Sequence, residues 1–119
     1  MPLRVIEEDQ HGVHLALSGV LDLTGVREVE LKFLAHTGSQ GKPALVDLSA
    51  VTFMASLGMR MLIEASRTLR RKGAALALLH PQPLVEDALR AAGVTDLIPV
   101  FHDEAQARAA LLSNQEKTP

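Results

Sequence analysis

Residues 45–58, near the middle of the chain, combine a short apolar run with the start of a segment of helical periodicity. Leu45, Val46 and Leu48 are typical of an interior strand. From Leu57 to Leu69, apolar residues then recur at helical spacing. Strand-like and helical segments continue to alternate along the chain. This pattern predicts an α/β fold whose small mixed sheet has an N-terminal hairpin followed by parallel strands, with about four α-helices.

The boundaries follow from the apolar runs and from the polar residues between them. We expect strands at residues 3–8, 13–18, 44–48, 74–79 and 98–100. We expect helices at residues 26–37, 57–72, 83–92 and 104–112. After Leu48 the chain should turn at Ser49 and Ala50 and re-enter the apolar layer at Val51 and Phe53. The length of 119 residues favours a single domain, residues 1–113, followed by a flexible C-terminal tail at 114–119.

Ser56 stands just before the central helical segment, where an N-cap is expected. A side-chain oxygen there can accept a hydrogen bond from the free N–H groups of the first turn. The same helix end carries partial positive charge, so it would also tolerate a phosphoryl group on Ser56. Gly58, in the first turn, should leave the approach to the serine open. Thr24 and Asp103 are expected to cap the first and last helices.

An ordered series of motifs covers nearly the whole chain. The segments are SGVLDL at 18–23, VDLSAVTFMASLG at 46–58, RRKG at 70–73, LLHPQPLVEDALRAAGVTDLIPVF at 78–101 and DEAQARAAL at 103–111. This series resembles the STAS domains, a family named for sulphate transporters and anti-sigma factor antagonists. The resemblance implies a single STAS-like domain acting as a bacterial anti-sigma factor antagonist in partner switching.

The resemblance also implies a phosphorylation site. Antagonists of this family usually carry Asp-Ser-Ser/Thr-Gly at the loop after the central strand, and a partner kinase phosphorylates the first serine. Here the four residues are Ala55, Ser56, Leu57 and Gly58. The phosphoacceptor Ser56 is therefore present, whereas the preceding acid and the second hydroxyl are absent.

The implied partner is a kinase-type anti-sigma factor, a serine-protein kinase of the histidine-kinase-like ATPase type. The unphosphorylated chain would bind it, phosphorylation of Ser56 would end the binding, and a serine phosphatase would reset the switch. ATP would belong to the kinase, so no cofactor is expected in this chain. The runner-up is an unphosphorylated scaffold, or an accessory subunit of a transporter or stress-signalling complex, which the missing acid before Ser56 favours.

Partner contacts are expected around the serine. Helical spacing directs Met59, Arg60 and Ile63 away from the buried stripe, so with Ser56 they form a plausible docking patch, unless a tail or another helix covers them. The resemblance places Asp22 on the same face, although it can equally be a turn or helix-start carboxylate. The expected partner-binding residues are Asp22, Thr24, Ala55, Leu57, Gly58, Met59, Arg60 and Ile63.

Composition argues against several other functions. The net charge of −2 and the absence of Trp and Tyr give no basic or stacking surface for nucleic acid. With no cysteine, neither a disulfide nor a thiolate metal site is possible. The five histidines match no common metal or catalytic spacing, so they are expected to be ordinary surface residues of a protein that is not an enzyme. No segment resembles a signal peptide or a membrane span, and we expect a cytoplasmic protein.

Overall fold

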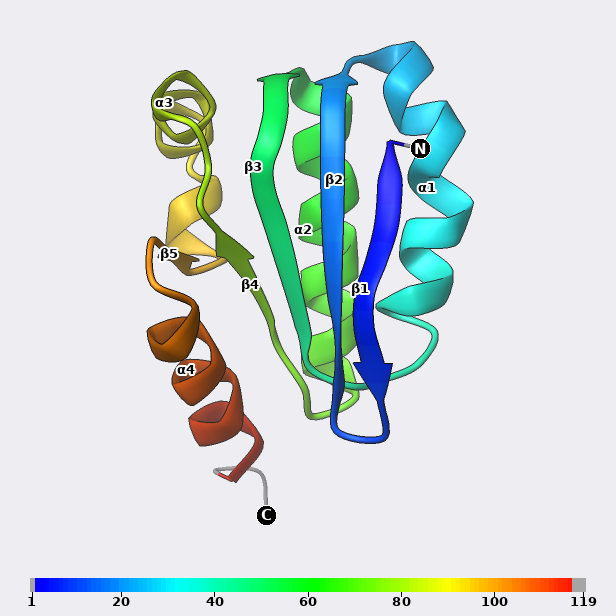
Figure 1. Ribbon diagram of the computed structural model, residues 1–119, viewed down its shortest axis with the longest axis vertical. Helices are drawn as coiled ribbons and strands as arrows, with labels where there is room; N and C mark the ends of the chain where they lie inside the picture. The colour runs from blue at the N-terminus through cyan, green and yellow to red at the C-terminus, as the bar shows by residue number, and fades with distance from the viewer. Residues whose placement is uncertain (1, 117–119) are drawn as a thin grey trace.

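The computed structural model describes residues 2–116 and, within them, a five-stranded sheet with four α-helices (Figure 1). The strands are β1 (Leu3–Asp9), β2 (Gly12–Leu21), β3 (Ala44–Met54), β4 (Leu76–Leu79) and β5 (Val100–Phe101). The helices are α1 (Leu23–His36), α2 (Ser56–Arg71), α3 (Pro83–Ala91) and α4 (Glu104–Glu116), with a 3₁₀ turn, η1 (Val94–Asp96), after α3.

The strands lie in the order β1-β2-β3-β4-β5. Strands β1 and β2 form an antiparallel hairpin, and every later pairing is parallel. The parallel strands therefore end at the same edge of the sheet, where β2 leads into α1 and β3 leads into α2. The predicted α/β class, the mixed sheet and the N-terminal hairpin are confirmed.

The two faces of the sheet are covered unequally. Helices α1, α2 and α3 contribute Phe33, Leu62 and Leu89 to the larger core on one face. On the opposite face, Ala107 and Leu111 of α4 pack in a smaller cluster with residues of β3 and β4. Figure 1 shows α4 at the end of the molecule remote from the β3–α2 connection. Helix α4 therefore does not cover the edge of the sheet where α2 begins.

Strand β3 does not stop at Leu48 but continues to Met54, so the expected turn at Ser49 and Ala50 is wrong. The pairing with β2 shifts there, with Ala16 opposite Asp47 but Ser18 opposite Ala50. The chain thus makes a β-bulge, and the Asp47 carboxylate accepts a hydrogen bond from the Ser49 N–H at 2.8 Å. Turn-forming residues here bend a strand without ending it.

The second half of β3 loses its partner on the β4 side, because β4 pairs only with residues from Ala44 to Asp47. The α3 segment takes that place, and Gln82 at its start donates a hydrogen bond to the Ser49 carbonyl at 2.9 Å. The extended β3 therefore carries the chain beyond the regular sheet before α2 starts.

Other boundaries differ by a few residues. Helix α1 begins at Leu23 rather than at 26, β4 begins at Leu76 rather than at 74, and β5 is Val100–Phe101 rather than 98–100. Helix α4 continues to Glu116, over part of the segment expected as a tail, and the rest of that segment, residues 117–119, lies outside the described residues.

Candidate functional site

Ser56 is the first residue of α2 and is exposed at the edge where the parallel strands end. The N-cap is Ala55, whose backbone is extended (φ −87°, ψ 173°) and whose side chain makes no capping bond. The expectation that Ser56 caps α2 is therefore wrong, because Ser56 has already entered the helix. Within the described residues its hydroxyl has no hydrogen-bond partner, and it is available to an incoming group.

Asp22 lies in the turn next to the one that carries Ser56. Leu21 is opposite Met54 in the β2–β3 pairing, and the Ala55 N–H donates to the Leu21 carbonyl at 3.0 Å. The exposed Asp22 carboxylate caps α1 by accepting a hydrogen bond from the Gly25 N–H at 3.0 Å. The alternative of a helix-start carboxylate is thus confirmed, and the expected capping role of Thr24, which lies exposed in the first turn of α1, is wrong.

Gly58 is buried where α2 packs on the end of β2. A Cβ atom at this position would lie 3.0 Å from Met54 Cγ and 3.2 Å from both the Cβ and the carbonyl oxygen of Leu21. Gly58 therefore permits close packing of the first turn. Because it is covered, its observed role is packing, and its contribution to partner contact stays a prediction.

Four large apolar side chains are exposed around the same edge. Leu57 is 36% exposed, and Val20, Leu23 and Phe53 are between 48% and 52% exposed. Val20 and Phe53 are opposite each other in the β2–β3 pairing, so they form an adjacent pair on one face. Phe53 does not re-enter the apolar layer as expected. Exposed apolar side chains gathered at one edge make this edge a candidate for partner contact.

Three of these residues, Val20, Leu23 and Phe53, were missed because the sequence presents them as parts of ordinary strand and helix runs. The signal that could have found Val20 and Phe53 is the alternation along β2 and β3. Leu21 and Met54 are buried, so the preceding residues, Val20 and Phe53, must point to the other face. The longer β3 had to be recognised first for this alternation to be visible.

A groove of about 410 Å³ runs along α2 from Ser56. Its α2 wall carries Met59, Arg60 and Ile63, and its other wall includes Ala92 and Val94 at the end of α3 and in η1. The structure thus brings together the four residues of the expected docking patch. Met59 and Ile63 are half-buried against the core rather than fully exposed, and Arg60 is exposed.

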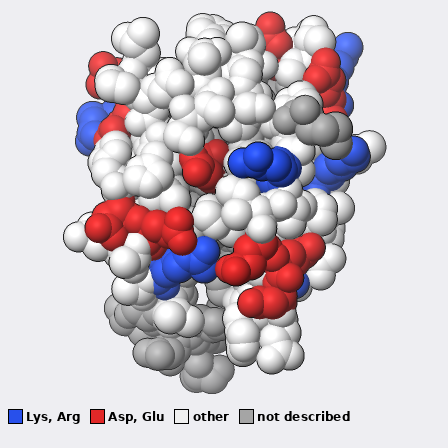
Figure 2. Space-filling view, viewed as in Figure 1, with Lys and Arg blue, Asp and Glu red and all other residues white. Residues whose placement is uncertain are grey.

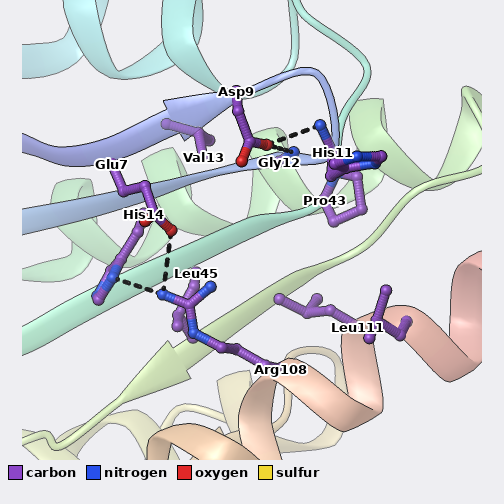
Figure 3. A pocket seen from close by; sticks show the side chains of 11 residues that line it. Glu7, Asp9, His11, Gly12, Val13, His14, Pro43, Leu45, Arg108 and Leu111 are labelled. Carbon is purple, nitrogen blue, oxygen red and sulfur yellow. Dashed lines mark hydrogen bonds and ion pairs between the residues drawn. The ribbon is translucent and has the colours of Figure 1, made fainter.

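A separate polar cluster fastens α4 to the sheet (Figure 3). Arg108 of α4 donates to His14 Nδ1 at 3.2 Å and lies 3.6 Å from the Glu7 carboxylate. His14 is only 7% exposed, so its expected surface position is wrong. Its Nε2 is buried without a hydrogen-bond partner in the described residues.

Burial lowers the pKa of His14 below its ordinary value, and Arg108 also lowers this pKa while the Glu104 carboxylate opposes the effect. Because the Arg108 guanidinium can only donate, His14 Nδ1 must accept, which requires the neutral ring with its proton on Nε2. The cluster is therefore a neutral-histidine contact. Among residues 2–116, no group of three or more His, Asp and Glu side chains is arranged to hold a metal ion.

Charged side chains of both signs are interspersed on the face seen in Figure 2, where no broad basic surface is visible. Within residues 2–116, no helix has the length and apolar character needed to cross a bilayer.

Comparisons with known proteins agree with the fold and with the motif series. A curated relative, the putative anti-sigma factor antagonist BtrV of Bordetella bronchiseptica, is 23% identical over 94 residues, which cover 79% of this chain and 81% of BtrV. A crystal structure of an anti-sigma factor antagonist from Mycobacterium paratuberculosis superposes with a TM-score of 0.79 at 20% identity, covering 92% of this chain and 94% of that one.

Two further structures share the fold. SpoIIAA of Bacillus, solved in its phosphorylated form, has a TM-score of 0.66 at 19% identity and covers 91% of this chain and 98% of its own. The murine anion transporter Slc26a9 has a TM-score of 0.73 at 20% identity over 90% of this chain, although only 18% of the transporter is matched. The family model described as "Mlab, STAS domain" matches residues 5–99. The chain therefore belongs to the STAS domain family.

Proposed function

We propose that this protein is an anti-sigma factor antagonist that works by partner switching. In its unphosphorylated form it binds a kinase-type anti-sigma factor through the surface around Ser56, and phosphorylation of Ser56 ends the binding. The observation that carries the proposal is the exposed serine at the start of α2, whose hydroxyl makes no capping hydrogen bond in the described residues. Exposed Leu57 and the groove along α2 border this serine. Membership of the STAS family and similarity to BtrV support the same function.

The chemical step belongs to the partner. The kinase transfers the γ-phosphoryl group of ATP to Ser56 Oγ, the bond from that phosphorus to ADP breaks, and the hydroxyl proton passes to a base of the kinase. A serine phosphatase restores the hydroxyl by hydrolysis. Because the reaction consumes ATP, we place the switch in the cytoplasm.

Phosphorylation would oppose binding for two physical reasons. It adds roughly two negative charges at pH 7, and these would be desolvated in a contact made partly of apolar side chains such as Leu57 and Met59. A loss of about 4 kcal/mol from these costs would weaken binding roughly a thousandfold.

The missing acid before Ser56 leaves Asp22 as the neighbouring carboxylate. Asp22 lies in the adjacent turn and is exposed. We propose that it contributes to the partner-binding face together with Thr24 and the residues around Ser56.

The test compares the affinity of the anti-sigma kinase for four forms of the chain by calorimetry: native, Ser56→Ala, Ser56→Asp and Ser39→Asp. Ser39 is also exposed but lies in the α1–β3 connection, at the opposite edge of the sheet, so it controls for added charge alone. We expect tight binding by the native chain, Ser56→Ala and Ser39→Asp, and a large loss for Ser56→Asp. Equal binding by all four would contradict the switch.

The second candidate function is an unswitched scaffold or accessory subunit of a transporter or stress-signalling complex. It is favoured by Ala55 in place of an acid, and the fold also occurs in the transporter Slc26a9. Its signature would be a stable complex with a transporter or stress-complex component that Ser56→Asp leaves intact.

A further inference from the structure

Arg60 stands four residues after Ser56 on the same face of α2. Side chains at this separation are neighbours, with Cβ atoms about 5–6 Å apart. A helical side chain also leans toward the N-terminal end of its helix, so a long side chain at position 60 covers the turn that contains position 56. Both residues line the same groove.

The guanidinium of Arg60 is exposed, and within the described residues it makes no hydrogen bond or ion pair. Two other arginines of this chain with the same helical setting are paired. Arg108 binds Glu104 at 2.8 Å, and Arg90 binds Glu86 at 2.9 Å, each across four residues. In both cases an acid precedes the arginine by one turn.

Helix α4 is the closer counterpart of α2. Glu104 is the first residue of α4, as Ser56 is the first residue of α2, and the arginine follows four residues later in each. In α2, Ser56 stands at the position that Glu104 occupies in α4. A phosphoryl group on that serine would supply an anion with three acceptor oxygens, and an arginine is suited to bind it with two parallel hydrogen bonds.

We propose that Arg60 is the partner of phosphorylated Ser56 within the same chain: the guanidinium closes onto the phosphate and forms an ion pair like that of Glu104 and Arg108. This rests on the proposed function, in which Ser56 is phosphorylated. The order of the pair, with the acid N-terminal to the base, is the more favourable one on a helix.

The pair has a consequence for the switch. In the unphosphorylated chain, the free guanidinium of Arg60 is part of the surface offered to the anti-sigma kinase. After phosphorylation it is held by the phosphate, so the partner meets a new anion and also loses access to a cation. Arg60 therefore holds the phosphate of Ser56 in place in the phosphorylated state.

The test uses protein in which phosphoserine is incorporated at position 56 during translation, so that no kinase is required. The second ionisation of the phosphate is followed by ³¹P NMR in the native background and in the Arg60→Gln, Arg60→Lys and Arg67→Gln variants. Arg67 also lines the groove and is unpaired in the described residues, but it lies eleven residues from Ser56, roughly 16 Å along the helix, so it is the matched control.

We expect Arg60→Gln to raise the pKa of the phosphate by about 0.2 to 0.4 relative to the native background, with Arg60→Lys in between and Arg67→Gln unchanged. The Nε–H signal of Arg60, and not that of Arg67, should shift as the phosphate titrates. Identical titrations in the native and Arg60→Gln proteins would overturn the pair.

Failure of the Arg60–phosphoserine pair is distinguishable from failure of the proposed function. If phosphoserine at position 56 abolishes kinase binding but Arg60→Gln leaves the titration unchanged, the switch stands and the pair is refuted. If Arg60→Gln shifts the titration but phosphoserine leaves kinase binding intact, the pair stands and the switch is refuted.

Discussion

Replacement of Gly58 by alanine tests how tightly the start of α2, which carries Ser56, is packed against the end of β2. The added methyl group would lie 3.0 Å from Met54 Cγ and 3.2 Å from the carbonyl oxygen of Leu21. Met54 is a flexible side chain and can move. The Leu21 carbonyl is backbone and already accepts the Ala55 N–H, so α2 itself must shift by a few tenths of an ångström.

Two opposing terms set the magnitude. Alanine favours a helix over glycine by about 0.5–1 kcal/mol, and overpacking a well-packed site costs about 1–3 kcal/mol. We therefore expect Gly58→Ala to lower the free energy of unfolding by about 1 kcal/mol. Gly25 occupies the same helical position in α1, but its added Cβ would lie only 2.0 Å from the Val20 carbonyl oxygen. Gly25→Ala should accordingly cost about 3 kcal/mol or more.

The assay is urea unfolding followed by circular dichroism. Ala35→Gly, at an exposed position of α1, measures the helix-propensity term alone and should cost up to about 1 kcal/mol. The expected order of stability is native, then Gly58→Ala, then Gly25→Ala. A Gly58→Ala protein that is more stable than the native one would refute the packing argument, because only the propensity term would then be acting.

Three further outcomes are expected. Asp22→Ala should lower the free energy of unfolding by about 1 kcal/mol in urea titrations, because α1 loses its N-cap. Asp22→Asn should retain most of the native stability, because asparagine also caps helices. Phe53→Thr should change stability by less than about 0.5 kcal/mol but weaken binding of the anti-sigma kinase about tenfold or more in calorimetry, because an exposed aromatic anchor is lost. Because the pKa of His14 is lowered in the folded chain, the unfolded chain binds more protons just below pH 6.5, and stability should fall as the pH drops through that window. In urea unfolding at a series of pH values, His14→Gln should lose the part of this pH dependence that belongs to His14.

Each of these predictions can fail clearly. An Asp22→Ala protein as stable as Asp22→Asn would contradict the capping role. If Phe53→Thr binds the kinase as tightly as the native chain does, Phe53 lies outside the interface. Equal pH dependence in the native and His14→Gln proteins would show that other groups cause it.

The sequence was sufficient for the order and type of the main elements. Apolar runs and helical periodicity identify the five strands and four helices, most clearly in β2, β3 and β4, which bury several residues each. The position of Ser56 between β3 and α2 follows from the same pattern. Local chemistry also predicted the Asp103 cap of α4, whose carboxylate accepts the Gln106 N–H at 3.0 Å.

The predictions from the sequence are wrong where tertiary contacts decide the local backbone structure. Ser49 and Ala50 are typical of a turn, yet pairing with β2 keeps them in a bulged strand. Ser is a better N-cap than Ala, but the Ala55–Leu21 hydrogen bond fixes which residue is extended at the start of α2.

The His14 cluster could not be predicted from spacing. His14 and Arg108 are separated by 94 residues, and only the packing of α4 on the sheet brings them together. Likewise, the exposure of Phe53 depends on β3 continuing past Asp47 without β4 beside it. No local pattern encodes either relation.

The proposed switch depends on Ser56 as its phosphoacceptor. The most direct measurement is intact-mass spectrometry of the native chain and of Ser56→Ala after incubation with ATP and each histidine-kinase-like anti-sigma protein from the same organism. We expect one kinase to add a single phosphate to the native chain and none to Ser56→Ala. Stable binding to one of these kinases without any gain in mass would refute the switch and would leave the chain as an unswitched binder.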